Sequence, residues 1–221
     1  MSSTSNLLLV VHVPKTAGTS FRHALVKCFG RSKVICDYGP KANRTSDIVR
    51  ECEYGLGNIQ SGNIVARAVS AKAKALTGHF PVEKYARYFD QENIISFARE
   101  PLERTCSEYI HRVTHADYRE SFDQFIEQPS IMNMQARYLQ HVPESAFIGL
   151  TARYSESLKY INRTFGLKLR EFQKNIRENG GGLGLMNNLS EDQIDRFYSL
   201  NAKDVELYNG IVEQFATKVL G

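Results

Sequence analysis

The sequence predicts an α/β fold, a three-layer α/β/α sandwich with helices on both faces of a central parallel sheet. Short apolar runs of strand length alternate along the chain with longer segments whose apolar residues recur at helical spacing. The 221 residues are 42% hydrophobic and 24% charged, as is typical of globular proteins and not of disordered or fibrous ones. No linker divides the chain, so we expect a single domain over residues 1–221.

The predicted strands are short apolar runs at residues 7–13, 33–36, 94–98 and 146–150, with another short strand leading into residues 77–79. The first run stops at Pro14 and is apolar on both sides, as expected of a strand buried in a parallel sheet. The secondary structure of residues 64–75 is not decided by the sequence, because their alanines favour a helix and their valines favour a strand.

Helices are predicted between these runs, at residues 19–29, 101–115, 122–127, 132–140, 155–165 and 204–220. Gly30 and Gly166 end two of them, and Pro101 suits a first helical turn. Ser190 and Gln193 form a capping-box pattern, so a further helix begins there. Residues 39–63 are expected to be a long loop with up to one helical turn, and residues 180–184 a flexible glycine-rich loop.

Charge and composition exclude several classes of function. The net charge is +4 with a pI near 8.8, and no Lys/Arg run exceeds two residues, so the sequence does not indicate a nucleic-acid binder. The longest apolar run, residues 7–11, is too short for a membrane span, and no signal peptide is recognised, so we expect a soluble cytoplasmic protein. The four cysteines fit no zinc pattern, so no metal is expected.

Residues 13–20, Val-Pro-Lys-Thr-Ala-Gly-Thr-Ser, lie between the first predicted strand and the first helix. Ligands bind at the carboxyl ends of parallel strands, and the backbone N–H groups at a helix start attract anions. Lys15, Gly18 and the hydroxyls of Thr16, Thr19 and Ser20 therefore suit a phosphate, although the spacing differs from the common nucleotide-binding loop. The alternative is a plain Ser/Thr-capped helix.

A second basic segment follows the strand at residues 94–98. Arg99 ends that strand, and Ser107 lies eight residues on, along the following helix. An arginine at a strand end can hold two phosphate oxygens at once. The alternative is an ion pair of Arg99 with Glu100 or Glu103.

Together these segments resemble the sulfotransferases that use 3′-phosphoadenylyl sulfate (PAPS), most closely their carbohydrate branch of heparan and chondroitin sulfotransferases and bacterial relatives. The first segment resembles their 5′-phosphosulfate loop, and Arg-x-Pro-x-x-Arg-x-x-Ser-x-Tyr at residues 99–109 resembles their 3′-phosphate site. Weaker stretches of the same pattern follow in order at residues 77–81, 133–139, 147–151 and 204–208.

The resemblance implies a P-loop-like fold and transfer of a sulfuryl group from PAPS to an acceptor hydroxyl, usually on a sugar, leaving 3′-phosphoadenosine 5′-phosphate (PAP). It implies that Lys15 contacts the leaving phosphate, that residues Thr16, Ala17, Gly18, Thr19 and Ser20 hold the 5′-phosphate, and that Arg99 and Ser107 hold the 3′-phosphate. No metal is needed. Golgi members of the family carry a membrane anchor and a stem, whereas we expect here a soluble bacterial-type enzyme or a catalytic domain.

The acceptor hydroxyl must lose a proton, and His79 is the candidate general base, because it follows a predicted strand and its side chain titrates near neutral pH. A histidine bonded to a turn is the alternative. His12 is expected to lie within the first strand and to face the core or a neighbouring layer. His23, His111, His115 and His141 are expected on helices or at their ends.

Other residues near these motifs leave two interpretations open. Asn133, Gln135 and Arg137 suit either acceptor binding or a buried structural network. Arg104 could position the 3′-phosphate site, but an ion pair with a neighbouring glutamate is favoured. The loop at residues 180–184 could close over the adenine side or simply lie at the surface.

Two other functions compete with sulfuryl transfer. One is a small-molecule kinase, which would need acidic Mg²⁺ ligands after a strand; only Glu100 follows residues 94–98. The other is a protein that binds PAP or PAPS without turnover. The acceptor, the position sulfated and the oligomeric state stay open.

Overall fold

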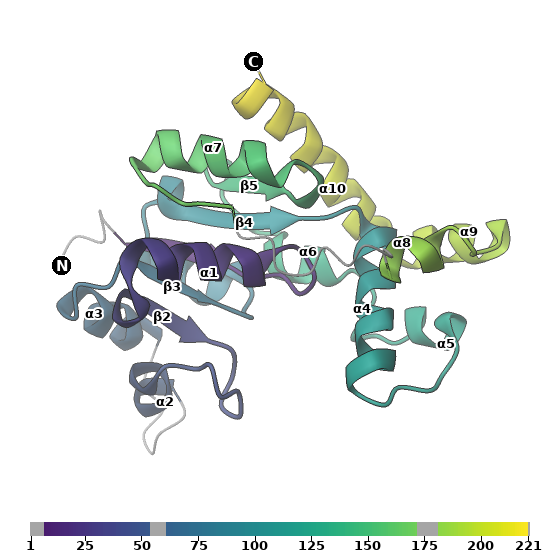
Figure 1. The fold of residues 1–221 in the computed structure, drawn as a ribbon, viewed down its shortest axis with the longest axis horizontal. Helices are drawn as coiled ribbons and strands as arrows, with labels where there is room; N and C mark the ends of the chain where they lie inside the picture. The colour runs from purple at the N-terminus through teal and green to yellow at the C-terminus, as the bar shows by residue number, and fades with distance from the viewer. Residues whose placement is uncertain (1–6, 54–60, 172–180, 221) are drawn as a thin grey trace.

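The computed structural model describes residues 7–53, 61–171 and 181–220. Within them, one parallel sheet has the order β2-β3-β1-β4-β5. Its strands are β1 (Leu8–Val11), β2 (Val34–Asp37), β3 (Ala75–Gly78), β4 (Ile94–Ala98) and β5 (Phe147–Leu150). The predicted α/β class with a central parallel sheet is confirmed (Figure 1).

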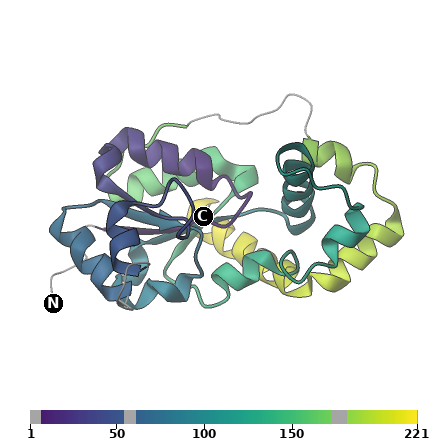
Figure 2. The ribbon, with the colours of Figure 1, turned by 90° about the horizontal axis from the view of Figure 1, so that it is seen from below.

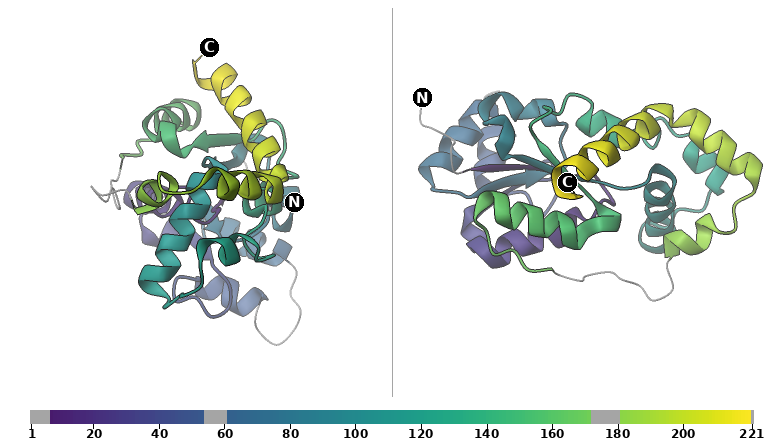
Figure 3. Two further views of the ribbon diagram at one scale, coloured as in Figure 1. Left: turned by 90° about the vertical axis from the view of Figure 1, so that its right-hand side faces the viewer. Right: turned by 90° about the horizontal axis from the view of Figure 1, so that it is seen from above.

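Helices cover both faces of the sheet. α1 (Gly18–Phe29) and α7 (Tyr154–Phe165) lie on one face, and α3 (Ser61–Ser70) and α10 (Ala202–Phe215) lie on the other (Figures 2 and 3). All strand residues are buried, which explains why their sequences are apolar runs and do not alternate. No helix in the described part of the chain is long and apolar enough to cross a membrane.

A second group of helices lies beyond the carboxyl end of β4: α4 (Pro101–His115), α5 (Phe122–Ile126), α8 (Gly181–Met186) and α9 (Glu191–Leu200) (Figure 1). These helices share their own apolar cluster, which contains Leu102, Cys106, Phe122, Phe125, Ile126, Ile131 and Phe197. α4 therefore joins two packed regions, because it begins at the sheet edge and ends among these helices.

Capping explains where several of these helices begin. The Glu100 carboxylate accepts from the N–H groups of Leu102 and Glu103, and Pro101 occupies the first turn of α4. α9 begins at Ser190 with the predicted capping box. α5 begins with another, formed by Ser121 and Gln124.

Some boundaries differ from those predicted. The residues of 180–184 that are described, 181–184, belong to α8 and not to a flexible loop. Within the segment 39–63, α2 (Asp47–Glu53) spans more than one turn and α3 begins at Ser61, while residues 54–60 fall outside the description. Within residues 64–75, for which helix and strand were left open, residues 64–70 belong to α3 and Ala75 begins β3.

The remaining elements are short. α6 (Met134–Leu139) precedes β5, and a π-helical turn (Ala216–Leu220) follows α10. Turns of 3-10 helix lie at Arg31–Lys33, Val82–Lys84, Ala86–Tyr88, Gln91–Asn93 and Thr151–Arg153.

Candidate active site

The loop between β1 and α1 turns tightly. Lys15 and Ala17 have φ angles of 68° and 66°, in the left-handed region that non-glycine residues rarely adopt. Thr16 is 1% exposed, and its hydroxyl donates to the Val13 carbonyl oxygen at 2.9 Å, which holds the bend. The Thr16 hydroxyl therefore has a structural partner, while its oxygen keeps acceptor capacity.

α1 begins in a form suited to an anion. Its N-cap, Ala17, offers no side-chain cap, no acidic residue lies in the first turn, and the first backbone bond back is from Phe21 N to Ala17 O. The N–H groups of Gly18, Thr19 and Ser20 are thus the unpaired donors of a helix start, and the side chains of Thr19 and Ser20 are half-buried beside them. This is the donor set that a phosphate or sulfuryl group needs.

Gly18 is required by a neighbouring side chain. A Cβ at Gly18 would lie 1.9 Å from Cδ2 of His12, so only glycine lets the His12 ring pack against the start of α1. The sequence suggested that this glycine admits a ligand; the structure adds a steric reason within the protein.

Arg99 brings the second predicted segment to the first. Its guanidinium donates to the Glu103 carboxylate at 2.6 Å and lies 3.4 Å from the Lys15 carbonyl oxygen. The alternative ion pair with Glu103 is therefore present, and it shows the guanidinium engaging an oxyanion, the chemistry that a phosphate also offers.

Gln135, on α6, fixes the backbone of Arg99. Its side chain accepts from Arg99 N at 3.0 Å and donates to Arg99 O at 2.8 Å. The buried Asp204 carboxylate on α10 accepts from the N–H groups of Gln135 and Ala136, which ties α6 to α10. Asn133 bonds Leu200, Asn201, Lys203 and Asp204. Asn133 and Gln135 thus form the structural network that the sequence left open.

Ser107 lies two turns along α4, half-buried under α8. A Cβ at Gly182 would lie 3.1 Å from Ser107 N and 3.2 Å from Ser107 Cα, so the backbones of α8 and α4 meet at this residue. The glycine-rich segment is therefore packed against a predicted 3′-phosphate contact.

The favoured ion pair of Arg104 with a neighbouring glutamate is not present among the described residues. Its side chain is 0% exposed, and Nη2 donates to the Thr105 hydroxyl at 2.9 Å. Nε and Nη1 have no hydrogen-bond partner within the described residues, and burial lowers the pKa of the guanidinium, opposed by Asp204 and Glu108.

His79 lies in a cluster of three rings at the carboxyl edge of the sheet. His12, Tyr38 and His79 are each the first residue after β1, β2 and β3, and the strand register brings them level. The centroid of the His79 ring lies 4.5 Å from that of His12 and 4.7 Å from that of Tyr38, both edge-on. Nδ1 of His12 lies 2.9 Å from the Tyr38 hydroxyl.

The pKa values of both histidines are lowered. The His79 side chain is exposed at the surface, yet desolvation by the protein around it lowers its pKa from 6.5 to about 4; Glu108 opposes this shift and Arg44 adds to it. Burial lowers the pKa of His12 well below 6.5, helped by His79, Arg22 and Arg44. At neutral pH His79 is therefore able to accept a proton.

Asp37 fixes the backbone around His79. His79 N donates to the Asp37 carbonyl oxygen at 2.9 Å, and a Cβ at Gly78 would lie 1.7 Å from that oxygen. The Asp37 carboxylate accepts from Lys84 at 2.8 Å and from the Tyr85 hydroxyl at 2.9 Å, which pins the turn after His79.

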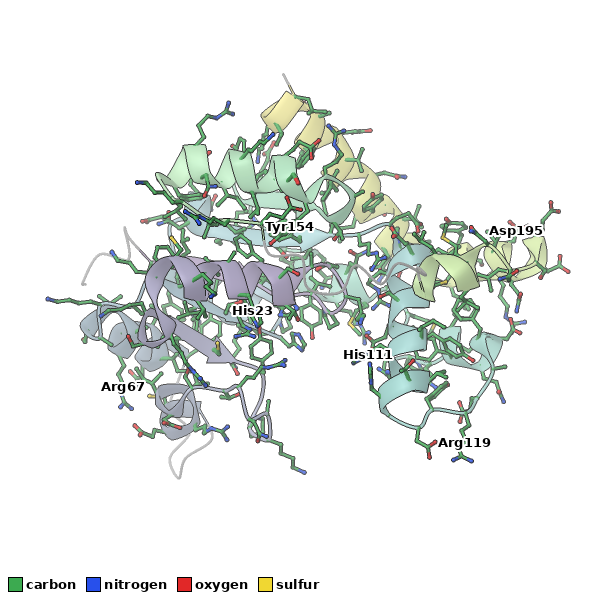
Figure 4. All side chains as sticks on the ribbon, viewed as in Figure 1. His23, Arg67, His111, Arg119, Tyr154 and Asp195 are labelled. Atoms are coloured by element: carbon green, nitrogen blue, oxygen red, sulfur yellow. The ribbon has the colours of Figure 1, made fainter. Side chains whose placement is uncertain are left out.

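The other histidines belong to helices or follow one. His23 is on α1 and His111 on α4, both labelled in Figure 4, and His115 also belongs to α4. His141 follows α6 and pairs with Glu83. Sequence reasoning missed Tyr38 and placed His12 inside the first strand, because the predicted strands do not end where β1 and β2 end.

One family profile matches most of the chain. The profile described as "Sulfotransferase family" matches residues 1–178. No curated protein matches the chain in sequence.

Solved structures are similar in fold. Mouse sulfotransferase SULT7A1 complexed with PAP has a TM-score of 0.56 at 12% identity, over 96% of this chain and 88% of that one. A sulfotransferase from Alicyclobacillus acidocaldarius has a TM-score of 0.46 at 14% identity, over 92% and 98% of the two chains. At these identities the likeness to SULT7A1 supports the α/β fold.

Proposed function

The chain belongs to the sulfotransferase family, and on this premise we propose that it transfers a sulfuryl group from PAPS to a hydroxyl of a carbohydrate acceptor. The observation that carries the proposal is the contact between the two anion-binding segments, in which Arg99 lies 3.4 Å from the Lys15 carbonyl oxygen. The uncapped start of α1 and the guanidinium of Arg99 fit two separate phosphates, as PAPS presents them.

On the donor side, each residue has a role suited to its position. The N–H groups of residues 16–20 and the hydroxyls of Thr19 and Ser20 would bind the 5′-phosphate. Arg99 and Ser107 would bind the 3′-phosphate, with Arg99 exchanging Glu103 for the phosphate oxygens. Lys15 would stabilise the negative charge that grows on the leaving phosphate oxygen as the sulfur–oxygen bond breaks, which lowers the barrier selectively.

On the acceptor side, His79 would take the hydroxyl proton as the acceptor oxygen attacks the sulfur in line. Its lowered pKa keeps it neutral and ready to accept that proton. The sulfuryl and phosphate charges placed beside it favour the imidazolium once it forms, and so offset the effect of crowding. Metal-ligand clusters of three or more His, Cys, Asp or Glu residues are not found in the part of the chain that is described.

Calorimetric titration with PAP, beside AMP, tests the donor side. We expect PAP to bind at micromolar or tighter affinity and AMP, which lacks the 3′-phosphate, at least about tenfold more weakly (about 1.4 kcal/mol). Equal affinities would remove Arg99 and Ser107 from the 3′-phosphate site, and an absence of PAP binding would overturn the proposal.

His79→Ala separates turnover from simple binding. With PAPS and a panel of sugars, the release of PAP should fall by at least about 100-fold, a typical share of a general base, while PAP affinity stays unchanged. His141→Ala, at an exposed histidine, is the matched control. A protein that only binds PAP would show no turnover in the unmodified chain either.

A further inference from the structure

The Tyr38–His12 pair connects the proposed base to the phosphate loop. His12 is 7% exposed and touches both sides: its ring packs against Gly18 at the start of α1 and edge-on against His79. Tyr38 touches both histidines, with its hydroxyl at Nδ1 of His12 and its ring edge-on to His79. The mechanism proposed above uses neither residue.

We propose that Tyr38 and His12 are positioning residues, which hold the His79 ring in place and align it with the phosphate loop. This inference rests on the proposed role of His79 as the base. It assigns a function to the hydrogen bond between Tyr38 and His12, which follow β2 and β1, the two strands on either side of β3.

The chemistry of the pair fixes the orientation of His12. Burial raises the pKa of the Tyr38 phenol, so the hydroxyl keeps its proton. A phenol can donate or accept, and we assign it as the donor to Nδ1 of His12, the stronger acceptor of the two groups. In this assignment Nδ1 of His12 is the acceptor and Nε2 carries the proton. With Gly18 against Cδ2 and Nε2, the His12 ring is constrained from both ends.

Charged groups around the ring cluster act on the protonation of His79 and His12. The charged and titratable groups that act on His79 or on its partner His12 are Glu108 on α4, Arg44 after β2, Arg22 on α1, and the two histidines themselves. Glu108 therefore favours protonation of His79, whereas Arg44 opposes protonation of both histidines and Arg22 that of His12.

Tyr38→Phe tests the pair, because it keeps the ring and removes only the hydroxyl. With PAPS alone, so that water is the acceptor, we expect kcat for PAP release to fall about tenfold, the ratio that corresponds to one net hydrogen bond. KM for PAPS and Kd for PAP should stay within about twofold. The acid limb of the kcat–pH profile should shift. Tyr160→Phe, in which the lost hydroxyl belongs to a ring stacked on Phe147, is the matched control.

A double variant distinguishes positioning from a general structural effect. In a His79→Ala background, Tyr38→Phe should cause no further loss, since its effect passes through His79. Additive losses, or an unchanged kcat in Tyr38→Phe alone, would overturn the inference. If His79→Ala itself left kcat unchanged, the proposed base would fail instead, so the two failures are distinguishable.

Nitrogen NMR of labelled histidines supplies a readout that needs no turnover. The unmodified chain should show His12 protonated at Nε2, and Tyr38→Phe should move the His12 Nδ1 resonance. Should Tyr38→Phe fail to fold, His12→Asn, which removes the contact with His79, is expected to give the same split of lowered kcat and unchanged PAP affinity. Protonation of His12 at Nδ1 in the unmodified chain would contradict the assigned hydrogen bond.

Discussion

At the scale of the residue, Lys15 offers the sharpest separation of binding from chemistry. Its backbone is in the left-handed region, in a loop whose bend is held by Thr16. We expect Lys15→Ala to lower kcat by about 100-fold, the usual effect of removing one preorganised charge stabiliser. PAP affinity should fall less than about tenfold, because PAP lacks the sulfuryl group whose departure Lys15 assists.

For Lys15→Ala, assays of PAP release measure kcat, and calorimetry measures the affinity for PAP. Lys27→Ala, at an exposed position in the last turn of α1, controls for the loss of one positive charge. Equal losses in kcat and in PAP affinity would mean that Lys15 binds the phosphate in the ground state and has no special role at the leaving oxygen.

Some residues of the candidate site could be predicted from the sequence, and others could not. Residues 15–20, Arg99 and His79 could be named because each follows a predicted strand and carries a polar group. The position of His12 could not be predicted because the apolar run continues to Val13. β1 ends at Val11, which leaves His12 at the carboxyl end of this strand. Tyr38 carries no pattern in the sequence, and only the register of β2 against β3 reveals its place.

At the scale of the element, α8 shows how packing decides between loop and helix. Glycines favour a flexible loop by local propensity, but within residues 181–186 the chain is helical against α4. Glycine at 182 is what lets the two backbones approach. The buried Arg104 has the same origin: its α4 position is charged in sequence, and only the packing of the helices beyond β4 removes it from water.

Gly182→Ala and Gly184→Ala form a matched pair on α8. A Cβ at Gly182 meets the Ser107 backbone at 3.1 Å, whereas a Cβ at Gly184 meets nothing within 4 Å. We expect Gly182→Ala to push α8 from Ser107 and weaken PAP binding about three- to tenfold, and Gly184→Ala to leave binding unchanged and stabilise the helix by up to about 1 kcal/mol. Calorimetry and thermal unfolding measure both; equal PAP affinities would show that α8 does not support the Ser107 contact.

At the scale of the whole molecule, the alternation of strands and helices along the chain was predictable, but the order of the strands within the sheet was not. Apolar runs followed by helices predict a parallel sheet, because parallel strands need crossover helices. The sheet order then brings the ends of β2, β3 and β1 side by side, with β4 next to β1. That order gathers the ring cluster, the phosphate loop and Arg99 at one edge, and no local pattern in the sequence specifies it.

The gathered histidines make the stability of the whole chain sensitive to acid. Because the folded-state pKa of His79 is lowered to about 4 and that of His12 well below 6.5, the unfolded chain binds more protons between these values and 6.5. The stabilisation is complete above about pH 6.5 and is lost as the pH falls towards 4. We therefore expect the thermal midpoint to drop between pH 7 and pH 5, and to drop less in His79→Gln. His141→Gln, at a histidine outside the ring cluster, is the control for loss of one imidazole. An equal or larger drop in His79→Gln would mean that its ring is not held neutral by the fold, and the general base would need another residue.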